Sequence, residues 1–303
     1  MSATPDDKNK ALLVRPGIGM TARVVQRGTL RFSRIVNDRP ALILLRHGTK
    51  TLHRLRSPHA QGADHAAQEW TIRGGQAIAI AGGGQVLDVI NRLSDKGLYE
   101  ARWLVWDPAI IARFQASRPG GGILAGAAPL GRPDAAFVAA FDRALEAIWD
   151  VQQIPADVAV HRLTEMLVWL SLRGIHFQAS DNPSLSIRLR RLFETALAER
   201  WTTAMAAERL AMSEATLRRR LAAEATSFGA QLTDMRMCSA MLLLQSTDFS
   251  VNRIALEVGY ESPSRFAIRF RQRFGFPPTA IRGANRAASN GASLEHMRSI
   301  ARS

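Results

Sequence analysis

The spacing of hydrophobic positions divides the chain into parts with different expected structure. Up to about residue 116, apolar residues come in short runs between glycines; Ala41–Leu45 ends before Gly48, and Gln76–Ala81 lies between two glycine clusters. Such runs are typical of an antiparallel sandwich or barrel. The pattern therefore predicts a polar tail over residues 1–15 and a β-rich N-terminal domain over residues 16–117.

A segment rich in glycine and proline, residues 118–133, follows this domain, and we interpret it as a linker. Within residues 134–182, apolar side chains recur at helical spacing in two stretches, Phe137–Ile148 and Leu163–Leu170. This spacing predicts two amphipathic helices that form a hairpin. Two interpretations of their apolar stripes stay open: the stripes form a dimer interface, or they pack on the N-terminal domain.

Residues 183–283 carry an internal repeat, with an offset of 48 residues at its start and 49 at its end. The corresponding pairs are Ala207 and Ala255, Leu210 and Val258, Leu217 and Phe266, and Leu221 and Phe270. A helix-turn-helix explains this pattern, because its two short helices cross closely and need a small residue at the crossing. Four residues later the chain turns sharply, where glycine is favoured because φ is often positive. Gly259 stands there in the second copy and Ala211 in the first.

The rest of the repeat fits the same motif. In each copy, apolar residues four positions apart give the second helix a buried side, and Ser213 or Ser262 can cap its start, with Pro263 following in the second copy. A longer apolar helix, about Phe228–Gln245, can bridge the two copies. The expected fold class is therefore α+β, with an all-α C-terminal domain of two helix-turn-helix units and a tail over residues 284–303.

The charge of the chain narrows the class of partner. Its formal net charge is +14, and every basic residue after Lys96 is an arginine. A positive balance favours nucleic acid or an anionic membrane surface, and the arginine fork suits phosphates and guanine edges. The longest apolar stretches fall far short of the roughly 20 residues that a bilayer needs. With a polar N-terminus and a single cysteine, Cys238, these features favour a cytoplasmic protein that binds nucleic acid.

The segment Ile254–Arg271, with Gly275 and Pro278 after it, resembles the signature of the AraC/XylS family of transcription regulators. The first copy is similar at a looser set of positions: Ser213, Leu217, Arg219, Leu221, Glu224, Thr226, Ser227, Phe228 and Arg236. Two positions depart from the pattern. Ala225 stands where the family usually has glycine, and Ile268 stands where many members carry arginine or another polar residue that faces DNA.

The resemblance implies a seven-helix domain whose two recognition helices enter successive major-groove segments on one face of double-stranded DNA. It also implies a preceding domain that senses an effector or dimerises, often as a cupin-like barrel. The expected partners are therefore DNA, RNA polymerase, a small-molecule effector in the N-terminal domain and a second copy of the chain. Activation is the usual mode of regulation in the family.

Helical geometry selects the residues that face DNA, since successive side chains are about 100° apart. With Leu217 and Leu221 inward, Arg219 lies opposite the core. The full set of candidate contacts is Ala215, Arg218, Arg219, Ser264, Arg265, Ile268 and Arg271. Ile268 can touch a thymine methyl but offers no hydrogen bond. We therefore expect the first unit to supply most base discrimination and the second mainly to anchor, with Arg269 and Arg273 either on phosphates or in solvent.

An alternative is a cupin-type metal enzyme fused to a DNA-binding domain. Such an enzyme holds its metal with closely spaced histidines. The histidines of the N-terminal region are six or more residues apart and form no His-x-His: His47, His53, His59 and His65. Cys238 lies in an apolar helix, which favours a buried thiol over a redox sensor. We therefore expect no catalytic residue, no metal and no cofactor.

Overall fold

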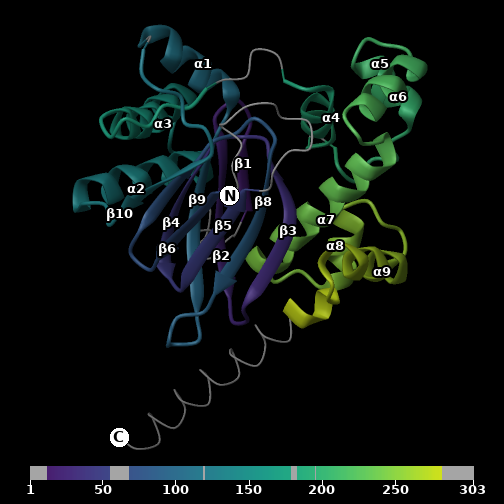
Figure 1. Ribbon diagram of the computed structural model, residues 1–303, viewed down its shortest axis with the longest axis horizontal. Coiled ribbons are helices and arrows are strands. Elements are labelled where there is room, and N and C mark those ends of the chain that lie inside the picture. Colours follow the sequence, from purple (N-terminus) through teal and green to yellow (C-terminus); the bar gives the residue numbers. More distant parts are fainter. Residues whose placement is uncertain (1–11, 55–67, 119, 179–182, 195, 282–303) are drawn as a thin grey trace, which may run out of the picture. The chain divides into compact units, whose positions relative to one another are not determined.

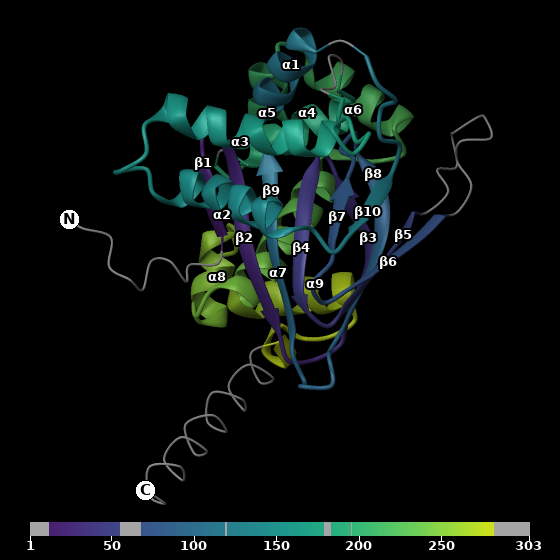
Figure 2. The ribbon, with the colours of Figure 1, turned by 90° about the vertical axis from the view of Figure 1, so that its left-hand side faces the viewer.

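The computed structural model describes residues 12–54, 68–118, 120–178, 183–194 and 196–281. The chain divides into two compact units, one of residues 1–25 and 29–182 and the other of residues 26–28 and 183–303, and each is described by itself (Figures 1 and 2). The predicted tail at 284–303 lies outside the described residues. The predicted polar tail at 1–15 is wrong at its end, because Leu12–Arg15 forms strand β1 and Arg15 donates to the carbonyl of Ala147.

In the part of the first unit that the structure describes, ten strands form two antiparallel sheets. The larger sheet has the order β1-β2-β9-β4-β7-β10 and the smaller has the order β3-β8-β5-β6. The strands are β1 Leu12–Arg15, β2 Gly19–Gln26, β3 Leu30–Asn37, β4 Ala41–His47, β5 Thr49–Arg54, β6 Gln68–Arg73, β7 Ala77–Ile80, β8 Gln85–Arg92, β9 Tyr99–Trp106 and β10 Ala127–Gly131. The β-rich N-terminal domain expected from the glycine-punctuated runs is confirmed.

Strand β4 shows why its sequence reads as one continuous apolar run. Its first five residues, Ala41 to Leu45, are all buried, because helices cover one face of the larger sheet and the smaller sheet covers the other. Gly48 ends the run at a φ of 90°, and a Cβ there would lie 2.4 Å from the carbonyl oxygen of Arg92. Only glycine fits this turn, so the sequence signal and the structure agree.

The described residues of the first unit include three helices: α1 Pro108–Ser117, α2 Ala135–Trp149 and α3 Ala156–Ser171. The apolar stripes of α2 and α3 are buried in one core with Leu42, Leu104 and Trp106 of the larger sheet. Of the two interpretations left open by the sequence, packing on the N-terminal domain accounts for these stripes. A dimer interface would have to use other surface.

The interpretation of residues 118–133 as a linker is wrong in its second half. Residues 127–131 form β10, which pairs with β7 in an antiparallel register that sets Ala127 opposite Ile80. Pro129 is compatible with a strand here because β10 is the edge of the sheet, where a missing donor costs no ladder bond. The sequence also missed α1, although Asp107 caps it by accepting from the amide of Ala109, with Pro108 next.

A lysine lies between the two sheets. Lys50 is 2% exposed, and its ammonium donates to Asn91 Oδ1 at 3.0 Å and to the Tyr99 hydroxyl at 3.4 Å. The same nitrogen lies 5.3 Å from the ring centre of Trp103. Burial lowers the pKa of Lys50 to about 7, because the charged form loses its hydration.

The second unit is all helical in its described part. Its helices are α4 Leu185–Glu194, α5 Thr203–Arg209, α6 Glu214–Ala223, α7 Phe228–Ser246, α8 Val251–Glu257 and α9 Pro263–Phe274. A further helical turn begins at 278–281, next to the end of the described residues. The predicted α+β fold class, a β-rich domain followed by an all-α domain, is confirmed. Among the helices that the structure describes, none has the length and apolar character to cross a membrane.

Candidate nucleic-acid interface

Two helix-turn-helix units with the same backbone geometry lie in the second unit of the chain. In the first, α5 leads through a turn into α6, and in the second α8 leads into α9. Equivalent hydrogen bonds close the two turns: the Met212 amide donates to the Ala207 carbonyl at 3.0 Å, and the Tyr260 amide donates to the Ala255 carbonyl at 2.8 Å. Both alanines are fully buried where the helices cross. The repeat predicted from the sequence is confirmed.

The turns also take the left-handed backbone that the sequence led us to expect. Ala211 has a φ of 55° and Gly259 has a φ of 81°. Gly259 meets a second constraint, because a Cβ there would lie 2.6 Å from Nη2 of Arg236. The positive φ and this close approach both favour glycine in the second turn, whereas the exposed alanine in the first turn is strained by its φ alone.

Side-chain caps start both recognition helices, as predicted. The Ser213 hydroxyl accepts from the Thr216 amide at 3.2 Å, and the Ser262 hydroxyl accepts from the Arg265 amide at 3.4 Å. Pro263 occupies the first turn of α9, where it has no helical donor to lose. These caps fix where α6 and α9 begin, and so which residues lie in their first turns.

Each recognition helix has one side in an apolar core. Leu217 and Leu221 of α6 pack with Phe193 and Trp201, whose rings are 5.2 Å apart. In the second unit, Phe266 and Phe270 of α9 are fully buried, and Phe270 contacts Phe274 at 4.8 Å between ring centres. The opposite sides of both helices are consequently turned away from the apolar cores of the C-terminal unit.

On α6, all three candidate residues, Ala215, Arg218 and Arg219, are exposed. Arg218 donates to Glu214 at 2.7 Å, one helical turn earlier, so its guanidinium already has a partner. Among the described residues, none forms a hydrogen bond or ion pair with the side chain of Arg219. Arg219 is therefore the uncommitted cation on the side of α6 opposite the core.

On α9, the four candidates Ser264, Arg265, Ile268 and Arg271 are exposed as well, and Ile268 is 58% exposed despite being apolar. Ile268 and Arg219 occupy the same position of the repeat. Sequence reasoning missed Gln272, which is exposed one turn after Ile268 on the same side of α9. The helical geometry that selected Ile268 would also have selected Gln272.

An open groove of about 760 Å³ adjoins this side of α9. It is lined by Thr233 and Arg236 of α7, by the turn residues Gly259 to Ser262, and by Arg265, Ile268, Arg269 and Gln272 of α9. The groove thus continues the exposed side of the recognition helix toward α7. Its lining holds three arginines against one acidic residue, Glu261, which suits a polyanion.

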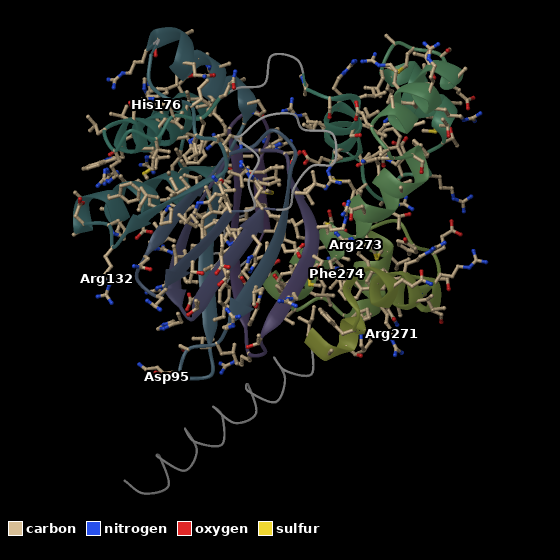
Figure 3. All side chains as sticks on the ribbon, in the orientation of Figure 1. Asp95, Arg132, His176, Arg271, Arg273 and Phe274 are labelled. Atoms are coloured by element: carbon tan, nitrogen blue, oxygen red, sulfur yellow. The ribbon has the colours of Figure 1, made fainter. Side chains whose placement is uncertain are left out.

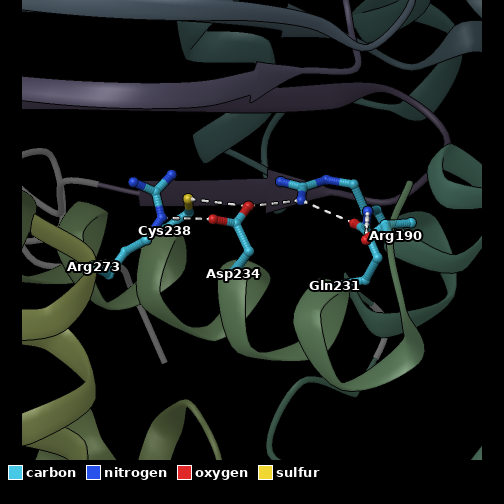
Figure 4. A network of polar contacts seen from close by, with 6 residues as sticks. Arg190, Gln231, Asp234, Cys238 and Arg273 are labelled. Atoms are coloured by element: carbon cyan, nitrogen blue, oxygen red, sulfur yellow. Dashed lines mark hydrogen bonds and ion pairs between the residues drawn. The ribbon is translucent and has the colours of Figure 1, made fainter. Parts of the chain in front are cut away.

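A polar network centred on Asp234 of α7 joins helices far apart in the sequence (Figure 4). Asp234 accepts from Arg190 of α4 at 2.9 Å and from Arg273 of α9 at 2.7 Å. The interpretation of Arg273 as a solvated charge is therefore wrong, because its side chain is mostly buried and its Nε donates to Asp234, whereas a phosphate contact of Arg273 stays a prediction. Arg271, by contrast, points outward (Figure 3).

Cys238 lies beside this network, with its Sγ atom 3.9 Å from Oδ2 of Asp234. Burial, and secondarily the negative charge of Asp234, raises the pKa of the Cys238 thiol to about 12. A thiol with this pKa stays protonated at neutral pH and is a poor nucleophile. The interpretation of Cys238 as an inert buried thiol fits this environment.

Arg236 ties α7 to both helix-turn-helix units. Its guanidinium donates to the carbonyls of Leu197 at 3.3 Å and Glu199 at 2.9 Å, which precede α5. Its Cζ atom also lies 5.7 Å from the ring centre of Tyr260, in the turn before α9. Together with Asp234, this arginine makes α7 a rigid spacer between the two recognition helices.

The alternative of a metal enzyme requires a cluster of metal-ligating side chains. In the described parts of the chain, no three histidine, cysteine, aspartate or glutamate side chains gather as metal ligands. His53 contacts Glu69 at 3.2 Å, whereas His59 and His65 lie outside the described residues.

Known proteins resemble the second unit in sequence. Residues 206–284 match the model of a family described as a helix-turn-helix domain. Over 97 residues the chain is 36% identical to the HTH-type transcriptional regulator GadX of Escherichia coli K12, which covers 32% of this chain and 35% of GadX. Over 93 residues it is 36% identical to the transcriptional activator AggR of Escherichia coli, covering 31% and 35%. The C-terminal unit is an AraC-type helix-turn-helix domain. The chain spans about a third of the length of these curated relatives, so they identify this AraC-type domain and not the remainder.

The whole chain resembles solved structures in fold. An apo crystal structure of a ToxT variant from Vibrio cholerae has a TM-score of 0.60 at 12% identity, covering 88% of this chain and 97% of ToxT. A second ToxT structure, with an unsaturated fatty acid bound, gives a TM-score of 0.58 at 12% identity, covering 86% and 93%. The β-rich domain followed by an AraC-type domain is therefore a known fold. No comparison supports a metal enzyme.

Proposed function

We propose that the protein is a sequence-specific transcription regulator that inserts α6 and α9 into the major groove of double-stranded DNA. The observation that carries this proposal is the pair of matched helix-turn-helix units, each with its apolar side buried and its opposite side exposed. The spacing between the two recognition helices is held by α7 through Asp234 and Arg236. Two helices on one rigid spacer suit two successive segments of one groove.

The two recognition helices offer different chemistry to DNA. On α6, Arg219 is the central residue, and Ala215, Ala222 and Ala223 around it are small and exposed. Small neighbours let the helix approach closely while the guanidinium reaches the O6 and N7 atoms of a guanine. We therefore assign base reading in the first unit to Arg219, with Arg218 on a neighbouring base or phosphate.

On α9 the central residue is apolar and its neighbours are polar, the opposite of the arrangement on α6. Ile268 is the apolar centre, and the polar side chains of Ser264, Arg265, Arg271 and Gln272 surround it. Ile268 suits a thymine methyl, and Gln272 suits an adenine edge. The arginines supply attraction to phosphates, which is independent of sequence. The second unit thus anchors the protein and adds a preference for A·T pairs.

We propose the remaining partners from the relatives. GadX is named a regulator and AggR an activator, so this chain acts on transcription, as an activator together with RNA polymerase. ToxT has been solved with an unsaturated fatty acid bound, and we propose that this chain too has a small-molecule effector, in its N-terminal domain. A homodimer formed by the N-terminal domain stays a prediction, and so does a cytoplasmic location beside the chromosome. No enzymatic activity is proposed.

Replacing Arg219 tests the function at one residue. Arg219→Ala is expected to weaken binding to the specific site by about 1–3 kcal/mol, with little loss on random DNA. The matched control is Arg220→Ala, which removes an exposed arginine on the same helix that does not lie opposite the core. It is expected to weaken both DNAs equally and slightly. Fluorescence anisotropy with both duplexes at fixed salt measures these effects.

The result that contradicts the assignment is an equal loss on specific and random DNA for Arg219→Ala. Arg219 would then contact a phosphate. If the unaltered chain binds no duplex more tightly than random DNA across a selection library, the proposed function itself fails.

A further inference from the structure

A small cavity of about 160 Å³ lies in the first unit, outside both sheets. Its most buried lining residues are Ile111 of α1, Leu167 of α3, and Ile175 and Phe177 in the segment after α3; all are at most 9% exposed. Phe114 of α1 adds an aromatic wall. The floor of this cavity, which we call the α1–α3 cavity, is therefore wholly apolar.

The wall opposite α1 is a glycine-rich loop that is fastened to the segment after α3. Ile123 pairs with His176 in a parallel bridge, and the Leu124 amide donates to the His176 carbonyl at 2.8 Å. At Gly121 a Cβ would lie 2.5 Å from the imidazole ring of His176, so the loop packs tightly on this ring. The wall is thus held in place by backbone bonds and close packing.

The rim of the α1–α3 cavity is polar and carries positive charge. Arg118, Gln115 and His176 line it, and among the described residues no acidic side chain does (His176 is labelled in Figure 3). The Arg118 guanidinium lies 5.7 Å from the ring centre of Phe114, which itself lines the cavity. The exposed arginine therefore lies over the cavity wall, and the described lining offers no carboxylate to neutralise its charge.

The size of the cavity limits what fits. An apolar cavity of about 150 Å³ in another protein accommodates one benzene molecule. The α1–α3 cavity therefore has room for one six-membered ring and no second ring. An apolar floor with a cationic rim selects a ring that carries a single negative group.

We propose that the α1–α3 cavity is a binding site for a small carboxylate with one six-membered ring. The ring packs among Ile111, Leu167 and Phe177, and the carboxylate accepts from the Arg118 guanidinium at the rim. Its use as an effector site rests on the proposed function, whereas the binding itself does not.

Isothermal titration calorimetry of the full chain with cyclohexanecarboxylate tests the site. We expect saturable binding of one molecule per chain. Cyclohexylmethanol and cyclohexylmethylamine, which keep the ring but change the charge, are expected to bind at least about tenfold more weakly, because a hydrogen bond to a charged group is worth about 1.5–3 kcal/mol. Acetate lacks the ring and adamantane-1-carboxylate exceeds the volume, so neither is expected to bind.

Two matched variants locate the binding. Arg118→Met keeps the side-chain stem and is expected to lower the affinity for cyclohexanecarboxylate about tenfold, leaving cyclohexylmethanol unchanged. Arg113→Met removes another exposed arginine of α1, one that does not line the cavity, and is expected to change nothing. Equal losses in both variants, or no saturable binding by the unaltered chain, would overturn the proposal and leave the cavity a packing void.

The two proposals fail in different measurements. The Arg219→Ala variant, impaired in specific DNA binding, is expected to bind cyclohexanecarboxylate as the unaltered chain does. If the carboxylate does not bind while specific DNA does, only the α1–α3 site is refuted. If the carboxylate binds but the chain binds no DNA sequence specifically, only the proposed regulator function is refuted.

Discussion

Two alanines of the AraC-type domain stand at helix ends where glycine would be less strained. Ala211 follows α5 and Ala225 follows α6, with φ angles of 55° and 54°. Each is followed by an amide that reaches back five residues: Met212 to the Ala207 carbonyl and Thr226 to the Leu221 carbonyl, both at 3.0 Å. This pattern is a helix end whose left-handed residue is usually glycine. We therefore expect Ala211→Gly and Ala225→Gly each to stabilise the domain.

The magnitude follows from two opposing terms. A left-handed conformation costs an L-residue about 1–2 kcal/mol. Glycine removes this strain but loses about 0.4–1 kcal/mol through the greater freedom of the unfolded chain. Both methyl groups are exposed, so their deletion leaves no cavity. The free energy of unfolding should rise by about 0.5–1 kcal/mol at each site, which is about 2–8 °C in the melting temperature of a domain of this size.

Urea and thermal unfolding of a fragment of residues 183–285 measure these changes. Trp201 is the single tryptophan of that fragment and lies in the apolar core of the first helix-turn-helix unit, so its fluorescence reports unfolding together with the circular dichroism of the helices. Ala222→Gly is the matched control. It exposes the same small area but lies inside α6, where glycine costs about 0.5–1 kcal/mol. If Ala211→Gly and Ala225→Gly destabilise the fragment as Ala222→Gly does, the reasoning is wrong.

Three further predictions concern other parts of the chain. Lys50 has a pKa of about 7 in the folded protein and about 10.5 in the unfolded chain, so between these pH values the unfolded state binds more protons. The free energy of unfolding of the N-terminal domain, measured with urea, should therefore rise by up to about 1.4 kcal/mol per pH unit relative to that of Lys50→Met. Parallel pH profiles of the two proteins would contradict this. Asp234→Asn should lower the free energy of unfolding by about 1–3 kcal/mol, because it leaves Arg190 buried without its carboxylate, and an unchanged urea midpoint would refute the network's contribution. A base-substitution scan of the bound DNA site should find that the half contacted by α9 tolerates substitution better than the half contacted by α6 and prefers A·T pairs. Gln272→Ala should weaken this preference for A·T pairs. A strict requirement for guanine under α9 would contradict the proposed difference between the two helices.

Local sequence signals were sufficient wherever one short stretch of chain decides the structure. The run Ala41–Leu45 is apolar at every position because both faces of its strand are buried, and Gly48 ends it where no Cβ fits. The repeat of residues 183–283 was readable for the same reason. A buried alanine, a left-handed turn, a serine cap and two apolar residues four apart all act within about twenty residues of each other.

Sequence signals failed where a residue or strand distant in the sequence determines the local structure. Pro129 and its glycine neighbours indicate a linker, and only the free edge of β7 turns residues 127–131 into a strand. The local sequence does not distinguish Arg273 from the exposed arginines near it on α9. Its side chain is mostly buried because it donates to Asp234, which lies 39 residues away in the sequence. Asp234, the single acidic residue of helix α7, was the available signal, because a charge there needs a partner.

Arg219 and Ile268 occupy the same position in the two helix-turn-helix units, and this difference raises the question of how the two units together select a DNA site. If each unit bound DNA independently, the second would select sites poorly, because an isoleucine has no hydrogen bond to offer a base. The contacts of Asp234 with α4 and α9, and of Arg236 with the segment before α5 and the turn before α9, oppose such independence. In the proposed complex with DNA, Arg219 sets the register and α7 determines which segment α9 meets. The proposed phosphate contacts and methyl preference of α9 then act on a single register, and on this proposal weak local selectivity becomes selectivity of the whole site.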